Sequence, residues 1–303
     1  MSLIECIPNF SEGRRGAVID KIEAAIASGG AHVLDVSSDV DHNRTVITLA
    51  GTPEAIEESA YRGIQTAAEY IDLTKHAGVH PRIGATDVVP FVPLQNASMA
   101  DCVRIAKRLG QRVGKQLDLP VFLYADAATE QKRENLAEIR RGGYERLQSR
   151  INQGLLPDYG SKTVGTAGAV VIGARGPLIA FNAYLDTGDV QVAKRIAVAI
   201  RESSGGLPGI KALGFLVDSQ AQVSMNITDY TKTSLYEVIS AIHAEAQQHG
   251  THVQSTEIIG LVPQQALLDA ALQCLQVRQA DYAKTIEHRL NTFTHAHNQI
   301  NFE

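Results

Sequence analysis

The sequence predicts an α+β protein built from two ferredoxin-like subdomains with a ligand crevice between them. Apolar residues recur at helical and strand-like spacings in the order β-α-β-β-α-β over residues 3–93, and the same order returns from Leu178 onward. The two halves share no evident sequence identity, so the repeat lies in the order of the elements. Crevices between α/β lobes are common small-molecule sites, which is why we expect the ligand there.

The domain boundary follows from this repeat. We expect an N-terminal subdomain over residues 1–175 and a C-terminal subdomain over residues 176–303. The turn at Ala174–Pro177 separates a strand that ends the first part from a strand that opens the second.

The helices and strands of the first part are predicted from the spacing of apolar residues and from residues that typically start or end such elements. Thr52, Pro53 and Glu54 form a strong helix start, with an N-cap, a proline at the first position and an acid in the first turn. Asn9 to Arg14 reads as a polar turn. The predicted strands are 3–7, 31–36, 46–50, 88–92, 121–124 and 169–172, and the predicted helices are 17–28, 53–71, 100–117 and segments up to 152.

In the second part the repeat is more regular. We expect strands over 178–184, 212–217, 222–227 and 257–261, helices over 190–201 and 235–249, and helical sequence from Gln264.

Composition narrows the class of protein. The chain has 303 residues, 44 % apolar and 20 % charged, with a formal net charge of −5, which argues against a protein that binds nucleic acid. No stretch approaches the roughly 18 apolar residues of a membrane-spanning helix, and no signal peptide is evident. Cys6, Cys102 and Cys274 are odd in number and far apart, which favours reduced thiols and a cytoplasmic location.

One stretch concentrates ionisable residues and residues with special backbone preferences. It runs from His76 to Asp87 and contains His80-Pro81-Arg82. Proline biases the preceding residue toward extended conformations, so His80 is expected on a shaped loop. The spacing of His76 and His80 would suit a metal pair on a helix. However, Gly78 and Pro81 disfavour a helix and no third ligand is nearby, so we expect no metal.

Without a metal, this stretch suits acid/base catalysis. Histidine titrates near neutrality, and Arg82 and Asp87 lie alongside in sequence. For a lone histidine, a role in holding the loop together would be the better reading. Because Arg82 and Asp87 lie nearby in the sequence, we favour a catalytic role for His80.

Other polar segments can be interpreted either as structural or as ligand-binding. Asn9 and Ser11 either cap the next helix or hydrogen-bond a polar ligand, and the acidic turn Asp39–Arg44 is either solvated or faces a cationic group. The small-residue segment 163–168 is either a linker or a place where a flat ligand approaches the backbone. Lys162 and Arg175 are either solvated or supply charge for carboxylates.

Five motifs along the chain resemble those of the formiminotransferase domain family. They are Glu5–Gly13, Asn43–Val46, His76–Val88, Ile179–Asn182 and Gly260–Pro263, the last followed by Ala266–Ala270. They occur in the same order as in the family and span nearly the whole chain.

The resemblance implies a glutamate formimidoyltransferase with two ferredoxin-like subdomains, active as a homodimer. It implies transfer of a formimino group from N-formimino-L-glutamate to N5 of the co-substrate tetrahydrofolate, as in histidine breakdown, without a metal. The catalytic histidine of the family falls on His80. Arg82 and Arg44 become candidate anchors for substrate carboxylates, and Asn9, Ser11 and Asp87 supporting residues. The folate-binding stretch falls on Gly160, Lys162, Thr163, Val164, Gly165, Thr166 and Gly168.

Two other functions stay open at this point. The chain could transfer a formyl group between 5-formyltetrahydrofolate and glutamate, because the two groups differ only by NH against O. It could also be a non-catalytic folate-binding protein on the same lobes.

Overall fold

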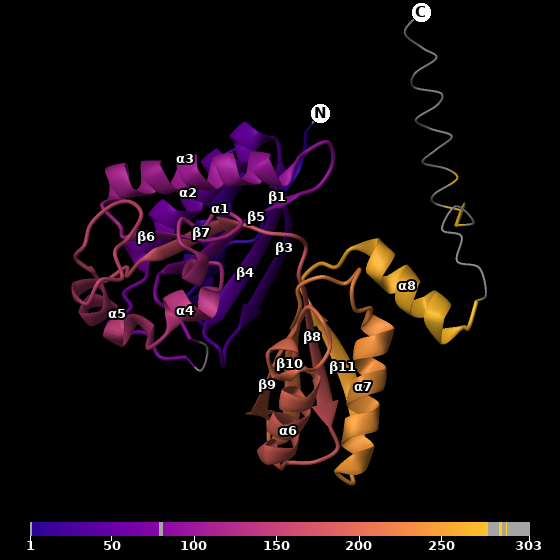
Figure 1. The fold of residues 1–303 in the computed structure, drawn as a ribbon. Helices are drawn as coiled ribbons and strands as arrows, with labels where there is room; N and C mark the ends of the chain where they lie inside the picture. Colours follow the sequence, from indigo (N-terminus) through magenta and orange to yellow (C-terminus); the bar gives the residue numbers. More distant parts are fainter. Residues whose placement is uncertain (1, 79–80, 278–284, 287–288, 290–303) are drawn as a thin grey trace, which may run out of the picture. The chain divides into compact units, whose positions relative to one another are not determined.

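A computed structural model of the chain describes residues 2–78, 81–277, 285–286 and 289. It divides into two compact units, residues 1–177 and 178–303, which are drawn in Figure 1 and are described here one at a time.

The first unit opens with a ferredoxin-like arrangement. Its elements are β1 (Ile4–Cys6), β2 (Asn9–Phe10), α1 (Gly16–Ala27), β3 (His32–Asp39), β4 (Arg44–Gly51), α2 (Pro53–Tyr70) and β5 (Thr86–Pro93). β1 and β2 together take the place of the first strand, lying between β4 and β5 and antiparallel to both. β3 pairs with the other side of β4. This order is that of the predicted β-α-β-β-α-β unit.

Two further strands extend this sheet beyond β5. They belong to the segment α3 (Met99–Leu117), β6 (Val121–Ala125), η1 (Gln131–Arg133), α4 (Leu136–Arg140), α5 (Gly143–Asn152) and β7 (Val170–Ala174). β7 lies parallel to β5, and β6 lies parallel to β7, so the described residues form a sheet of seven strands.

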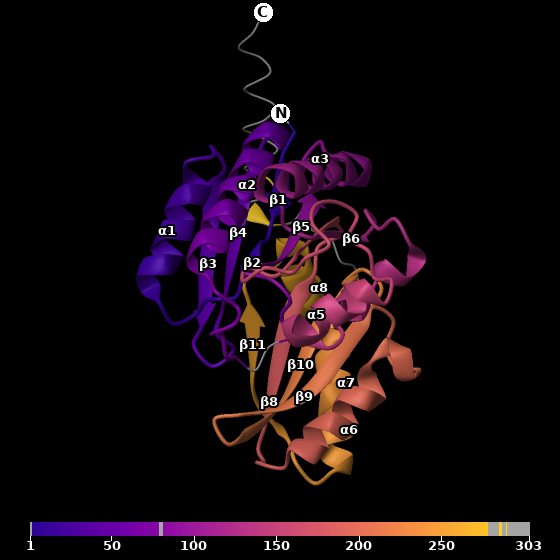
Figure 2. The same cartoon turned by 90° about the vertical axis from the view of Figure 1, so that its left-hand side faces the viewer.

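Helices cover both faces of this sheet (Figures 1 and 2). α1, α2 and α3 lie on one face over a large core that includes Phe10, Ile64 and Leu109. α4 and α5 lie on the other face, where Ile139 and Leu147 pack in a second core. The arrangement leaves β5 covered from both sides, which buries the polar residue Asp87 within it.

Helix starts follow the sequence signals. The Thr52 hydroxyl accepts a hydrogen bond from the Ala55 N–H, with Pro53 at the first position, as predicted. α3 begins with a capping box in which the side chains of Ser98 and Asp101 each accept the other's backbone N–H.

The prediction is wrong at Asn9 and Phe10. Asn9 and Phe10 form strand β2 instead of the beginning of a polar turn. Pro8 interrupts the first strand because it has no N–H to donate, although its carbonyl still accepts from the Ile47 N–H at 3.0 Å. The Phe10 side chain is buried in the core, and this apolar anchor keeps the pair in the sheet.

The second unit repeats the ferredoxin-like order. Its elements are β8 (Ile179–Leu185), α6 (Val190–Ile200), η2 (Glu202–Ser204), β9 (Ile210–Val217), β10 (Gln220–Ile227), α7 (Leu235–Gln248), β11 (Val253–Ile259) and α8 (Gln264–Cys274). The strand order is β11-β8-β10-β9, and every pairing is antiparallel. A core that includes Phe181, Ile196 and Val238 lies under α6 and α7.

The predicted fold class, α+β with two ferredoxin-like units, is therefore confirmed. β7 and β8 do not pair with each other across the turn at Ala174–Pro177, because β7 joins the first sheet and β8 the second. The domain limits at residues 175 and 176 and the ligand crevice stay predictions. No helix in the described part of the chain is long and apolar enough to cross a membrane.

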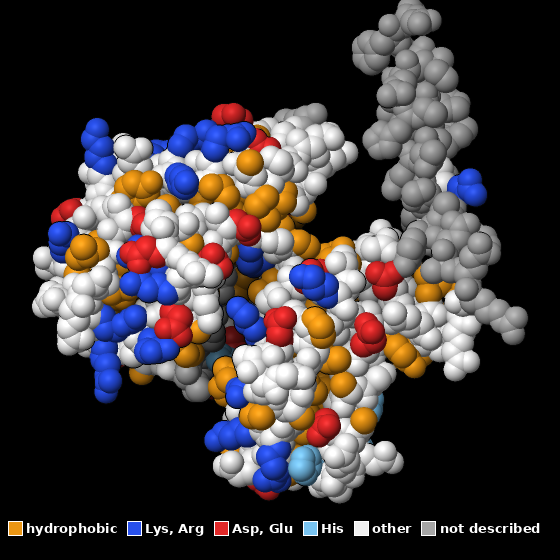
Figure 3. Space-filling view, in the orientation of Figure 1, with side chains coloured by type: hydrophobic (Ala, Val, Ile, Leu, Met, Phe, Trp, Pro, Cys, Tyr) orange, Lys and Arg blue, Asp and Glu red, His pale blue; other side chains and the backbone are white. Residues whose placement is uncertain are grey.

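Figure 3 shows Lys and Arg side chains gathered over α3. Three of them are paired: Arg104 with Asp101, Arg108 with Glu57, and Arg112 with Glu58. Arg104 and Arg108 are exposed, and ion pairs made by exposed side chains contribute little to stability, so we interpret this face as a solvated helix surface.

Gly84 tests the close packing of the first unit. A Cβ built on it would lie 1.8 Å from the Ala169 carbonyl oxygen, whereas a Cβ on Gly165 would meet nothing within 4 Å. We expect Gly84→Ala to lower the free energy of unfolding by about 3 kcal/mol, because backbone must move to accommodate the methyl group. Gly165→Ala is expected to change it by less than about 0.5 kcal/mol. Urea unfolding of both variants measures this, and equal effects would contradict the packing described.

Candidate active site

A β-bulge in β5 places Asp87. Asn9 pairs with Val88, and the next residue, Phe10, pairs with Thr86, so Asp87 is the extra residue between them. Bulges re-aim side chains and are frequent beside functional sites.

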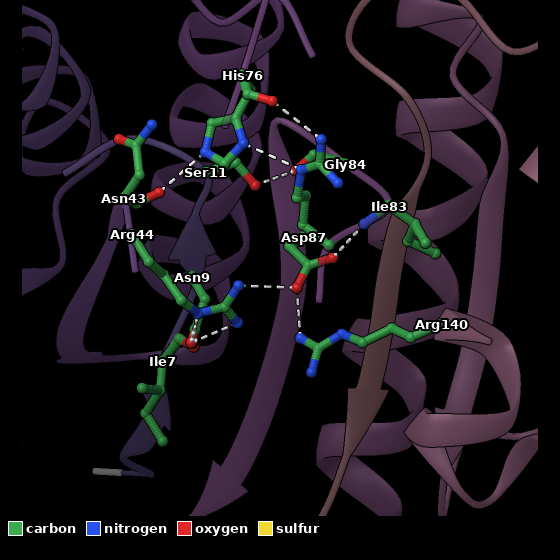
Figure 4. Close-up of polar contacts among 11 residues, drawn as sticks. Ile7, Asn9, Ser11, Asn43, Arg44, His76, Ile83, Gly84, Asp87 and Arg140 are labelled. Carbon is green, nitrogen blue, oxygen red and sulfur yellow. Dashed lines mark hydrogen bonds and ion pairs between the residues drawn. The ribbon is translucent and has the colours of Figure 1, made fainter. Parts of the chain in front are cut away.

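The carboxylate of Asp87 is fully buried and joins three parts of the first unit (Figure 4). Oδ1 accepts the Ile83 backbone N–H at 2.9 Å. Oδ2 accepts from Arg44 Nη1 at 2.9 Å and also from Arg140 Nη2. Burial alone would raise the pKa of Asp87, but the charges of Arg140 and Arg44 and the Ile83 N–H outweigh it and lower the pKa below its ordinary value. The group is therefore a buried anion.

The guanidinium of Arg44 is bound by Asp87 on one side and by Asn9 on the other. Its Nε and Nη2 donate to the Asn9 side-chain oxygen at 3.1 and 2.8 Å, and Asn9 Nδ2 donates to the Ile7 carbonyl at 2.8 Å. Burial, together with the nearby charge of Arg140, lowers the pKa of Arg44 to about 10, against the opposing effect of Asp87. The guanidinium still carries its charge at neutral pH.

A second chain of hydrogen bonds runs through the histidine loop, the segment between α2 and β5 that contains His76, His80 and Arg82. Arg82 Nε donates to His76 Nδ1 at 3.0 Å, so Nδ1 is the acceptor and Nε2 carries the hydrogen that reaches the Asn43 carbonyl, also at 3.0 Å. Arg82 also donates to both carboxylate oxygens of Glu145, at 2.8 and 3.3 Å. Both ring nitrogens of His76 are thus occupied, which makes it a structural residue of the loop.

His80, the predicted catalytic residue, lies outside the described residues, but the chain just before it is anchored. Asn43 Nδ2 donates to the Ala77 carbonyl at 3.1 Å, while the Asn43 side-chain oxygen accepts the Gly13 N–H at 2.9 Å. Gly78 passes so close to the backbone that a Cβ there would lie 2.4 Å from the His42 carbonyl oxygen. The absence of a side chain at Gly78 therefore allows the loop to pack against the backbone at His42.

Ser11 is buried, and its hydroxyl donates to the Gly84 carbonyl at 2.7 Å. This bond ties the end of β2 to the histidine loop. The neighbouring Glu12 caps the turn before α1, since one of its oxygens accepts the N–H groups of Arg14 and Arg15.

The predicted folate stretch, residues 160–168, lies against the same loop. Leu73 N–H donates to the Thr166 carbonyl at 2.8 Å, and Gly84 and Gly168 form an isolated β-bridge. Gly168 has φ +71°, and a Cβ on it would lie 2.1 Å from the Ile83 carbonyl oxygen.

The other side of this stretch rests on α5. Gln148 accepts the Val164 N–H at 2.8 Å and donates to the Lys162 carbonyl at 3.1 Å. Lys162 and Thr163 are exposed, as are Gly165 and Thr166. The structure thus brings the histidine loop and this stretch together and leaves several of its residues open to solvent.

Sequence reasoning predicted helical segments up to residue 152 but missed what the segment α4–α5 contributes to the site. This segment supplies Arg140 to Asp87, Glu145 to Arg82, and Gln148 to the 160–168 stretch. The available signal was the run Arg140-Arg141-Gly142-Gly143, in which two arginines precede two glycines that both adopt positive φ.

In the second unit, the motif that begins at Ile179 is divided between two faces. Phe181 is buried in the core, whereas Asn182 Nδ2 lies 3.4 Å from Glu257 Oε2. The Tyr184 hydroxyl donates to the same Glu257 oxygen at 2.9 Å. Within the described residues, no group of three or more His, Cys, Asp or Glu side chains could hold a metal ion.

Fold and site together define a protein of two ferredoxin-like units, the first of which carries a buried arginine–carboxylate cluster beside a histidine loop. Residues 3–175 match the formiminotransferase domain, N-terminal subdomain, and residues 180–290 match the formiminotransferase domain. The chain belongs to the formiminotransferase domain family, which confirms the resemblance seen in its motifs.

Individual relatives agree. The chain is 45 % identical to a glutamate formimidoyltransferase of Streptococcus pyogenes serotype M1, over 94 % of this chain and 97 % of that protein. It is 45 % identical to another of that name from Thermoplasma acidophilum, over 96 % and 98 %. It is 43 % identical to the formimidoyltransferase-cyclodeaminase of Mus musculus, over 89 % of this chain and 52 % of that longer protein.

Asp87→Asn tests the buried cluster. We expect a loss of about 3–5 kcal/mol in the free energy of unfolding at pH 7, because two arginines lose their shared anion. The folded-state pKa of Asp87 is lowered, so its contribution is complete above the ordinary carboxyl pKa of ~3.9 and is lost as pH falls through the folded value. The difference between wild type and variant should therefore shrink toward pH 3.

Urea unfolding between pH 7 and pH 3 measures this difference. The exposed Asp20→Asn serves as the control and should change little at any pH. A wild-type minus Asp87→Asn difference that stays constant over this range would contradict the assignment of a buried anion.

Proposed function

We propose that this chain transfers the formimino group of N-formimino-L-glutamate to N5 of tetrahydrofolate, giving 5-formiminotetrahydrofolate and L-glutamate. The observation that carries the proposal is 45 % identity to proteins named glutamate formimidoyltransferase, over nearly the full length of both chains. Tetrahydrofolate acts here as a co-substrate, and the chemistry needs no metal.

In the proposed mechanism His80 is the general acid and base. N5 attacks the planar formimino carbon to form a tetrahedral intermediate, and N5 loses its proton. The bond from that carbon to the glutamate nitrogen then breaks, and this nitrogen must be protonated to leave as an amine. A histidine that titrates near neutrality can accept the first proton and supply the second.

The anchored loop supports this role. On one side of His80, Asn43 holds the Ala77 carbonyl; on the other, Arg82 is fixed by Glu145, and Asp87 binds the Ile83 N–H. A loop fixed at both ends can hold a catalytic group in one place, and positioning contributes much of the rate in two-substrate reactions.

The stretch 160–168 is the proposed folate-binding segment. Its exposed backbone at Gly165 has open space around it, and its contacts with the histidine loop would bring a bound pteridine near the acid/base residue. Homodimerisation and a cytoplasmic location remain predictions from the family resemblance and from the free cysteines.

The function is tested by an absorbance assay. Protein, tetrahydrofolate and formiminoglutamate are mixed and then acidified, which converts the product to 5,10-methenyltetrahydrofolate. Formylglutamate serves as a second donor. Signal from formiminoglutamate supports the proposal. Signal from formylglutamate alone would reassign the chain to formyl transfer, and no signal with retained folate binding would make it a binding protein.

His80→Ala is expected to lower kcat by about 10²–10⁴-fold, the range typical of general acid/base groups. Folate affinity, measured by calorimetry, should stay close to that of the wild type. The matched control is His76→Gln, which removes the other histidine of the loop; its effect should fall on stability more than on kcat. A His80→Ala variant with wild-type turnover would refute the assignment.

A further inference from the structure

The arginines of the site differ in how many of their donors are in use. Arg82 donates to His76 through Nε and binds Glu145 through both of its amino groups. Arg44 uses Nε and Nη2 on Asn9 and Nη1 on Asp87. Neither guanidinium presents an unoccupied edge, so neither is well placed to take a substrate carboxylate without giving up a partner.

Arg140 is the exception. It binds Asp87 through Nη2, while the described residues provide no hydrogen bond to its Nη1. Its Nε is buried and also has no partner among them. In Figure 4 one amino group of Arg140 approaches the Asp87 carboxylate, and the other points away from it. The buried Nε is an unmet donor, which is uncommon, whereas Nη1 is not among the buried unpartnered atoms and is the free donor that a ligand can reach.

The charge of the cluster leads to the same conclusion. Arg44 and Arg140 have side chains that are 10 % and 15 % exposed, and they share the single, fully buried carboxylate of Asp87. One positive charge is left over in a desolvated place. Uncompensated buried charge is costly, so the cluster favours an anionic ligand.

The backbone under Arg140 is fixed in advance. It is the last residue of α4, where carbonyl groups lack partners within the helix. Arg150 satisfies them, because its guanidinium donates to the carbonyls of Glu138, Ile139 and Arg141. Arg140 is therefore presented from a rigid support, as a binding residue should be.

We propose that Arg140 binds a carboxylate of a substrate through its free Nη1, with Asp87, which Arg44 also binds, holding its guanidinium in place. The inference rests on the proposed function for the nature of the ligand. Both substrates carry suitable groups: the amino-acid portion of formiminoglutamate and the glutamate tail of tetrahydrofolate. A hydrogen bond from a guanidinium to a carboxylate is charge-assisted, so Nη1 suits either group.

The experiment compares Arg140→Gln and Arg140→Lys with wild type, and the control is Arg141→Gln. Arg141 is the next residue; it is exposed, and among the described residues its side chain pairs with Glu138. Calorimetry measures the affinity for L-glutamate, for tetrahydrofolate and for tetrahydropteroate, which lacks the glutamate tail. Formimino transfer is measured in parallel, with KM and kcat for each substrate.

We expect Arg140→Gln to weaken binding of one carboxylate ligand at least about 30-fold, with Arg140→Lys recovering part of it and Arg141→Gln unchanged. If the donor supplies the carboxylate, the affinity for L-glutamate and the KM for formiminoglutamate change while folate binding does not. If the folate tail supplies it, wild type prefers tetrahydrofolate to tetrahydropteroate and Arg140→Gln loses that preference.

Two results would overturn the proposal. One is unchanged affinity for every carboxylate ligand in a folded Arg140→Gln protein, and the other is an equal loss for all three ligands in both Arg140 variants. The binding measurements need no turnover, so a wild type without transferase activity would refute the proposed function and still leave Arg140 testable.

Discussion

The first unit depends on one buried anion. The Asp87 carboxylate is removed from water, which on its own would be costly, and three donors from separate parts of the chain compensate for it. Ile83 belongs to the histidine loop, Arg44 begins β4, and Arg140 ends α4. Because one carboxylate holds all three, the loop, the sheet and the covering helices are fixed relative to each other within this unit.

Around the Asp87 carboxylate, further polar side chains orient the residues of the site. Asn9 orients Arg44, and Glu145 orients Arg82, which in turn fixes the tautomer of His76. Ion pairs of this kind contribute little as isolated contacts on a surface. Here Arg82 combines its ion pair with the exposed Glu145 with hydrogen bonds to the ring and the carbonyl of His76, so these contacts together specify one arrangement of the loop. The described residues on either side of His80 are held in that arrangement by these contacts.

Much of the fold could be read from the sequence because it rests on local signals. Periodic apolar positions and the Thr52-Pro53-Glu54 start identified α2, and the same reasoning found both β-α-β-β-α-β units. The bulge at Asp87 could not be foreseen, since it depends on the register of β2 against β5. Asn9 was assigned to a turn because its polarity outweighed the burial of Phe10. The parts played by Arg140 and Glu145 arise from contacts across more than fifty residues, which no local pattern records.

The most direct test of this account is the ionisation of Asp87. Carbon-13 labelling of aspartate carboxyl groups, with Asp87→Asn to assign the resonance, follows its titration by NMR from pH 8 down to pH 3 in the folded protein. The account predicts that the titration midpoint of Asp87 lies below the ordinary carboxyl value of ~3.9, because the charges of Arg140 and Arg44 and the Ile83 N–H lower its pKa. A titration midpoint at or above the ordinary carboxyl value of ~3.9 would contradict the buried anion on which the site is built.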